Sequence, residues 1–230
     1  IRDVERSRGL GDVYKRQVSA LNWAHNQKLQ DRYLNYQGNR TFEKAVYDYV
    51  QGNKKQAYRS LGHILHLIED MAVPAHTRQD THFDGLGDPG EPYEKWVKEN
   101  TDLSHLNNLN PLQEDFHCSD LDDCLNKVAR YSNENFFSED TIRDKSYRLP
   151  RSFRSEVTPD LIIYYGKTID DPSEYPLAVF ERETKKLTLK YSFIHRAYWQ
   201  RLSKKAVLAG IEVIRIFQEE VAKAKKDQSL

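Results

Sequence analysis

Histidines and carboxylates are concentrated in one short stretch of the chain. Four of the eight histidines lie within twenty residues, interleaved with acidic side chains: His63, His66, His76 and His82, with Glu69, Asp70 and Asp80. Zinc accepts imidazole and carboxylate ligands together, whereas calcium and magnesium favour shells of oxygen alone. The composition of this stretch therefore predicts a metal centre, with zinc as the best-fitting ion.

The spacing of three of these residues places them on one side of a helix. Apolar residues recur at threes and fours over residues 54–73, which predicts a helix that Pro74 ends. At about 100° per residue, His63, His66 and Asp70 lie within roughly 60° of arc. We expect this face to be turned inward, where a carboxylate is costly unless it is paired or binds a metal. A buried ion pair without metal is the alternative.

Two further residues extend this pattern beyond the helix. Pro74 breaks the helix and turns the chain, so His76 is expected to reach the same cavity from another direction. A loop is predicted over residues 77–92, and a helix over residues 91–100 then adds Glu94. The combination favours a metal centre over an isolated ion pair.

These residues carry a resemblance to a known family. The run QAYRSLGHILHLIEDMAVPAH over residues 56–76, followed by Tyr93-Glu94, resembles the bacterial zinc-dependent phospholipase C family, which shares its fold with fungal single-strand-specific zinc nucleases. The resemblance implies a mainly α, multi-helix single domain with up to three zinc ions. It also implies hydrolysis of phosphate esters by a metal-activated water.

The resemblance assigns ligands residue by residue. His66 and Asp70 would hold one zinc, with Asp70 able to touch a second metal, while His76 and Glu94 would hold another. The family usually has a histidine four residues before this glutamate, where this chain has Gly90.

Three residues near these ligands have weaker assignments. His82 is the candidate to replace the missing histidine, and an exposed loop histidine is the alternative reading of it. His63 and Asp80 are expected to orient ligands rather than bind the metal.

The start of the chain limits what is expected of it. It opens on Ile1, and residues 12–17, DVYKRQ, look like the translation of a sequencing-library adapter, so residues 1–17 are predicted to be non-native and residues 18–230 to form a single domain. The resemblance implies that the general base and further zinc ligands lie upstream. We therefore assign no catalytic residue, and expect one or two zinc ions and little activity. His25 lacks the family context and is interpreted as an ordinary surface or cap histidine.

The substrate class follows from the family and from charge. The resemblance favours a phospholipid or another phosphodiester, with a single-strand nuclease or a catalytically impaired zinc-binding helical module as alternatives. Residues 79–125 carry twelve acidic and two basic residues, which argues mildly against a nucleic acid. The whole chain has a formal net charge of zero, so charge alone names no partner.

Cysteine usage and hydropathy bear on location. Cys118 and Cys124 are interpreted as a local disulfide, ahead of free thiols and of a metal site with His117. Together with the family, this pair suggests a secreted or periplasmic protein. The longest unbroken apolar run, Leu161 to Tyr165, is far below the roughly 18 residues of a membrane span, so no transmembrane segment is predicted.

Periodicity predicts a mainly α fold with one small β insertion. Helices are expected over residues 18–36, 42–50, 54–73, 91–100, 121–137 and 197–225. A small β-hairpin or three-strand insertion is expected near residues 161–191, with strands over 161–165, 177–182 and 187–191 and a turn at residues 184–186.

Overall fold

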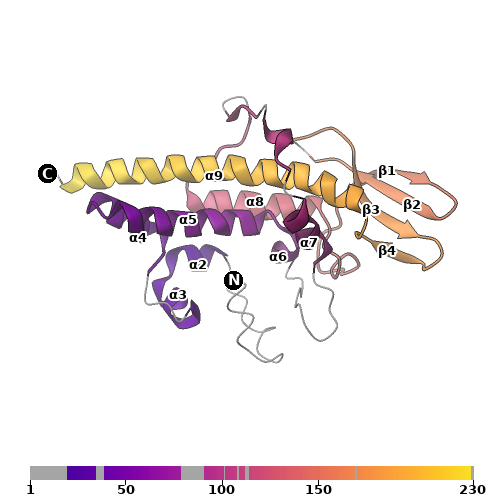
Figure 1. Cartoon of the computed structure of the whole chain (residues 1–230), viewed down its shortest axis with the longest axis horizontal. Helices are drawn as coiled ribbons and strands as arrows, with labels where there is room; N and C mark the ends of the chain where they lie inside the picture. Colours follow the sequence, from indigo (N-terminus) through magenta and orange to yellow (C-terminus); the bar gives the residue numbers. More distant parts are fainter. Residues whose placement is uncertain are drawn as a thin grey trace. The chain divides into compact units, whose positions relative to one another are not determined.

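The computed structural model describes most of the chain and is mainly helical (Figure 1). The described residues are 20–34, 39–78, 91–100, 102–107, 109–111, 114–168 and 170–228. Residues 1–17, His82, Asp80 and Gly90 lie outside this part, so the interpretations placed on them stay predictions. None of the described helices combines the length and the apolar content that crossing a membrane requires.

The helices follow the predicted order closely. They are α2 (Ala20–His25), α3 (Gln27–Leu34), α4 (Phe42–Val50), α5 (Lys54–Met71), α6 (Pro74–Thr77), α7 (Pro92–Glu99), α8 (Leu121–Asn135) and α9 (Ser192–Gln228), with a 3-10 turn, η2, over Ser104–Leu106. The predicted helix over residues 18–36 is instead two helices. The side chain of Asn26 interrupts it by accepting a hydrogen bond from the backbone N–H of Leu29 (3.1 Å), which caps α3.

Contacts divide the chain into two compact units. The first comprises residues 1–70, 115–126 and 207–230, and the second comprises residues 71–114 and 127–206. The single domain expected over residues 18–230 stays a prediction.

The first unit is built around apolar faces of α4, α5 and α9. Phe217 of α9 packs edge to face against Phe42 and Tyr49 of α4, with ring centroids 6.3 and 5.5 Å apart. Gly210 of α9 lies close to Leu65 of α5, whose Cδ2 would be 3.7 Å from a Cβ added there. These contacts fix the helix whose polar edge carries the candidate ligands.

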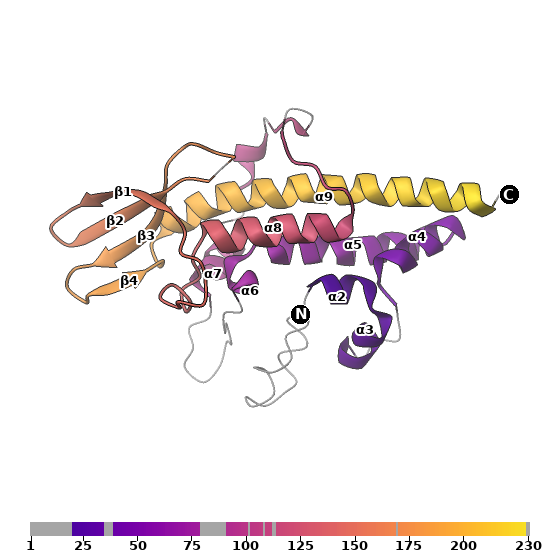
Figure 2. The same ribbon diagram turned by 180° about the vertical axis from the view of Figure 1, so that it is seen from behind.

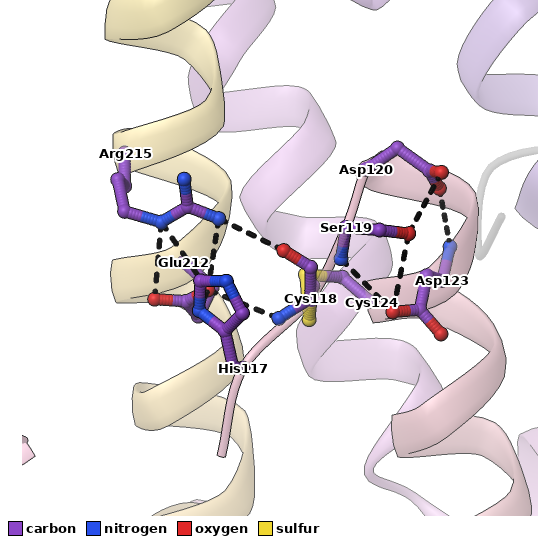
Figure 3. Close-up of a disulfide and its surroundings, with 8 residues drawn as sticks. All are labelled: His117, Cys118, Ser119, Asp120, Asp123, Cys124, Glu212 and Arg215. Atoms are coloured by element: carbon purple, nitrogen blue, oxygen red, sulfur yellow. Dashed lines mark hydrogen bonds and ion pairs between the residues drawn. A yellow bond between two sulfur atoms is a disulfide. The ribbon is translucent and has the colours of Figure 1, made fainter.

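A disulfide joins Cys118 and Cys124 in the first unit, as the sequence analysis favoured (Figure 3). The N–H of Cys118 donates to Glu212 (3.0 Å), and Arg215 donates to the Cys118 carbonyl (2.8 Å). Asp120 then accepts the N–H of Asp123 (2.8 Å) at the start of α8. The disulfide and these hydrogen bonds therefore fix the backbone where α8 begins.

The second unit contains the β insertion, which is larger than predicted. Four strands, β1 (Ser152–Val157), β2 (Leu161–Gly166), β3 (Tyr175–Glu181) and β4 (Lys186–Thr188), pair in sequence order as an antiparallel meander, seen from both sides in Figures 1 and 2. The strand predicted over residues 187–191 is instead β4, which begins one residue earlier and ends at Thr188, where the N–H of Leu189 donates to the side chain of Glu139 (2.7 Å) rather than to a strand. β1 was not predicted.

An aromatic core holds this sheet to the helices of the second unit. The hydroxyl of Tyr198 in α9 donates to the Leu177 carbonyl of β3 (2.7 Å) and accepts the N–H of Phe137 (3.2 Å). The rings of Phe136 and Tyr198 are 4.8 Å apart in a T-shaped arrangement. Tyr175 of β3 packs in the same cluster and donates to the Asn135 carbonyl at the end of α8.

Candidate metal centre

His66 and Asp70 lie one turn apart on α5, in the first unit. Nε2 of His66 is 3.6 Å from Oδ2 of Asp70, and Nδ1 is 3.9 Å from Oε2 of Glu69. The carboxylate of Glu69, and after it that of Asp70, raise the pKa of His66 above its ordinary 6.5, although partial burial acts in the opposite direction. His66 therefore has a carboxylate near each of its two ring nitrogens, and His66 and Asp70 interact electrostatically as the spacing predicted.

The expectation that this whole face turns inward is wrong for His66. Its side chain is 56% exposed, whereas the side chain of Asp70 is 11% exposed. The buried residues of α5 centre on Ile64, from which Asp70 is about 120° and His66 about 160° around the helix at 100° per residue. The helix face that carries Asp70 and His66 therefore begins at the edge of the buried side of α5 and extends into solvent.

Asp70 has an unsatisfied oxygen. Its Oδ2 is buried and has no hydrogen-bond partner among the described residues. The imidazole of His66, at 3.6 Å, is too far away to donate a hydrogen bond to it. A buried carboxylate oxygen that accepts no hydrogen bond is costly unless it binds a cation. This atom is therefore suited to a metal ion.

His76 and Glu94 lie together in the second unit. Nε2 of His76 is 2.6 Å from Oε1 of Glu94, and their side chains are 11% and 15% exposed. Pro74 starts α6 and Pro92 starts α7, so each of these two short helices begins at a proline that presets its first turn. Two residues that are 18 apart in the chain thus meet in a largely buried position.

The end of α6 is held by its own contacts. Arg78, which follows α6, is fully buried, donates to the Arg148 carbonyl (2.8 Å) and packs over the ring of Phe137. Asn133 of α8 donates to the Thr77 carbonyl (3.0 Å). These bonds fix the short helix that carries His76.

His63 has a different partner from the one expected of a ligand-orienting residue. Its Nε2 accepts the indole N–H of Trp23 (2.8 Å). Burial, and then the positive charges of Arg40 and His66, lower its pKa to about 4. His63 is therefore neutral near pH 7, with its proton on Nδ1, since Nε2 is the acceptor.

The donor sets can be compared with the geometry of zinc. Tetrahedral zinc with bonds of 2.0–2.2 Å holds its N and O ligands roughly 3.4 Å apart. The pair His66 and Asp70, at 3.6 Å, matches this separation, whereas His76 and Glu94, at 2.6 Å, would have to move apart by most of an ångström. The residue types fit zinc at both pairs. Within the described part of the chain, no three or more such side chains form a group that could hold a metal.

His25 is more than the ordinary surface or cap histidine that the sequence suggested. Its Nδ1 bonds to Glu43 of α4 and its Nε2 to Asp122 of α8 (2.8 Å). Partial burial lowers its pKa, but the two carboxylates outweigh this and raise the pKa above 6.5. His25 also lines a hollow of about 520 Å³ in the first unit, with walls from α4, α9 and the start of α8.

Comparisons with protein-family models, with curated proteins and with solved structures find no match to this chain. The resemblance over residues 56–94 therefore depends on the motif residues themselves.

Proposed function

We propose that this protein is a zinc-dependent hydrolase of phosphate esters, similar to bacterial phospholipase C. The proposal rests on the motif over residues 56–94 and on one structural observation, the pair His66 and Asp70. Their nitrogen and oxygen lie 3.6 Å apart, close to the separation of two ligands of tetrahedral zinc, and the carboxylate oxygen is buried with no hydrogen-bond partner among the described residues. His76 and Glu94 add a second pair of zinc-ligating residue types, which would have to move apart to hold an ion.

The four ligand candidates have distinct roles in this proposal. His76 and Glu94 hold one ion, and His66 and Asp70 hold another, for which the buried Oδ2 of Asp70 supplies the negative charge. Zinc, when bound, polarises a phosphoryl oxygen and lowers the pKa of water to about 7. Because His66 is more than half exposed, a substrate can reach its ion from solvent. A catalytic zinc usually has three protein ligands and one open position, so each of these pairs needs one further protein donor.

The test of metal binding is elemental analysis of protein purified without chelators. We expect at least one equivalent of zinc per chain, reduced in His76→Ala, Glu94→Ala and His66→Ala. The matched control is His117→Ala, which removes a histidine whose side chain is 71% exposed, and which should keep the full zinc content. Absence of zinc from the wild-type protein with the fold intact, or equal loss in the control, contradicts the site.

The test of substrate class uses the zinc-loaded protein. A phosphatidylcholine analogue and single-stranded DNA are offered separately, and slow hydrolysis of the lipid analogue is the expected result, in keeping with the little activity expected of this chain. Hydrolysis of DNA alone would contradict the assignment as a lipid enzyme and favour the single-strand nuclease.

A second candidate is a helical module without catalysis. The observation in its favour is that the described residues contain no group of three or more metal-ligating side chains. In that case the His76 and Glu94 contact is a structural hydrogen bond, and Glu94→Gln should retain it. Bound zinc without turnover on either substrate would favour this module.

A further inference from the structure

β1 forms an open edge of the sheet in the second unit. It pairs with β2 on one side, and no strand of the described residues pairs with its other side. All six residues of Ser152–Val157 are exposed. A strand edge of this length presents unpaired backbone groups that can pair with another chain.

Apolar side chains are unusually exposed along this same edge. On β1, Val157 is 63% and Phe153 is 55% exposed, and Leu149, three residues before the strand, is 60% exposed. Proteins protect edge strands with charges, bulges or a covering loop, and β1 carries two charges and a bulge, yet all six of its residues are exposed. β1 has a bulge at Phe153, so its regular part runs from Arg154 to Val157.

The outward-facing backbone groups of this regular part can be identified. The N–H of Thr158 donates to the Leu161 carbonyl (2.8 Å), so the backbone polar groups of Thr158 face β2. Because successive residues of a strand point these groups to opposite sides, Glu156 also faces β2. Ser155 and Val157 therefore present their N–H and C=O groups to the open side.

The sequence of the edge is complementary to itself. In an antiparallel pair of two β1 strands with Ser155 opposite Ser155, Arg154 of each copy lies opposite Glu156 of the other. Two ion pairs form at once, because a two-fold axis repeats every contact. The backbone groups of Ser155 then bond across the axis.

The two neighbouring registers lose this complementarity. Moving the centre to residue 154 places Arg154 opposite Arg154, and moving it to residue 156 places Glu156 opposite Glu156. Like charges directly opposite each other destabilise a strand pair. Within one chain the guanidinium of Arg154 stacks on the ring of Tyr165 (3.6 Å), pairs with Glu174 and lies 3.8 Å from Glu156. The carboxylate of Glu156 also accepts the hydroxyl of Tyr165 (3.0 Å). In the favoured register, a second copy adds its own Glu156 to this cluster from the open side.

We propose that the open edge of β1 binds the β1 edge of a second copy of this chain, antiparallel and centred on Ser155. The two four-stranded sheets then continue through the two-fold axis. The exposed backbone of β1 and its exposed apolar side chains become covered in part.

The test is sedimentation equilibrium of the full chain from micromolar to near-millimolar concentration. The wild-type protein should dimerise, and added salt should weaken the dimer because its centre carries four charges. Arg154→Glu and Glu156→Arg should each raise the dissociation constant at least about tenfold, since each puts like charges opposite each other twice. Lys186→Glu, the same charge reversal on the opposite edge strand β4, should change nothing.

Mixing the two variants separates a lost interface from a lost fold. An equimolar mixture of Arg154→Glu and Glu156→Arg should dimerise again, because each chain then offers two charges opposite to those of the other. Ser155→Pro should abolish dimerisation without disturbing the pairing of β1 with β2, because it removes an outward N–H. A wild-type chain that stays monomeric throughout the range, or a mixture that fails to associate, overturns the proposal.

Discussion

Lowering the pH from 7 to 5 is expected to destabilise the protein through His195. This residue lies on α9 and is only 4% exposed, and its Nε2 has no hydrogen-bond partner among the described residues. Burial lowers the pKa of His195 to about 4 from its ordinary 6.5, although a bond with the backbone of Leu189 acts in the opposite direction. The rings next to it are those of Tyr93 and Trp96, which carry no charge in this range.

The sign and size of the effect follow from proton linkage. Above pH 6.5 the imidazole is neutral in both the folded and the unfolded chain, so it does not make the free energy of unfolding depend on pH. Below pH 6.5 the unfolded chain binds a proton that the folded chain does not, and stability falls until pH reaches about 4. For these two pKa values the loss at pH 5 is about 2 kcal/mol, and its limit at lower pH is about 3 kcal/mol.

The assay is urea unfolding of the wild-type chain and of His195→Phe at pH 7 and pH 5. Phenylalanine keeps an aromatic ring beside Tyr93 and cannot be protonated. Other groups titrate equally in both proteins, so the difference between the two pH dependences isolates His195. The variant should lose about 2 kcal/mol less than the wild type on acidification. Equal losses would refute the argument that a buried neutral imidazole destabilises the fold in acid.

Three smaller changes test the backbone and the disulfide by thermal or chemical unfolding. Gly62→Ala on α5 should stabilise by up to about 1 kcal/mol, because a Cβ there meets no atom within 4 Å and alanine favours helix. Gly52→Ala has the same open surroundings but a φ of +85°, so it should destabilise by about 1 kcal/mol, and a gain would contradict the assigned conformation. Replacing Cys118 and Cys124 together by serine should cost about 2 kcal/mol from the closed loop alone, and an unchanged midpoint would show that the loop is equally ordered without the bond.

The helices were predictable where one face is apolar and the ends carry clear signals. The range predicted for α4, residues 42–50, is the one observed, whereas the helix predicted over residues 54–73 ends at Met71, two residues early, and Pro74 begins α6. The break at Asn26 was not predicted, because the side chain of Asn26 competes for a backbone N–H without any change in hydrophobic pattern.

β1 could not be predicted from periodicity. The pattern that marks a strand is the alternation of buried and exposed side chains, and all six residues of β1 are exposed. What specifies β1 is its pairing with β2, which joins Glu156 to Ile163 and Val157 to Ile162.

The candidate site was predictable in part. Spacing on one helix correctly placed His66 and Asp70 within reach of each other, because a helix fixes neighbours at i and i+4. The contact of His76 with Glu94 was expected only through the family resemblance. The two bonds of His25 could not be predicted, since one of its partners, Asp122, is 97 residues away in the chain.

The fluorescence of the three tryptophans should report the protonation of the histidines next to them. All three lie beside an imidazole. The indole N–H of Trp23 donates to His63. The ring centroids of Trp96 and His195 are 6.2 Å apart, and those of Trp199 and His105 are 6.4 Å apart. All three imidazoles have a lowered pKa, in each case chiefly through burial. An imidazolium quenches indole emission more strongly than a neutral imidazole does. In a chain that stays folded, the intrinsic fluorescence should therefore fall as the pH approaches about 4, where His63 and His195 become protonated, so acid titrations can be followed without a label.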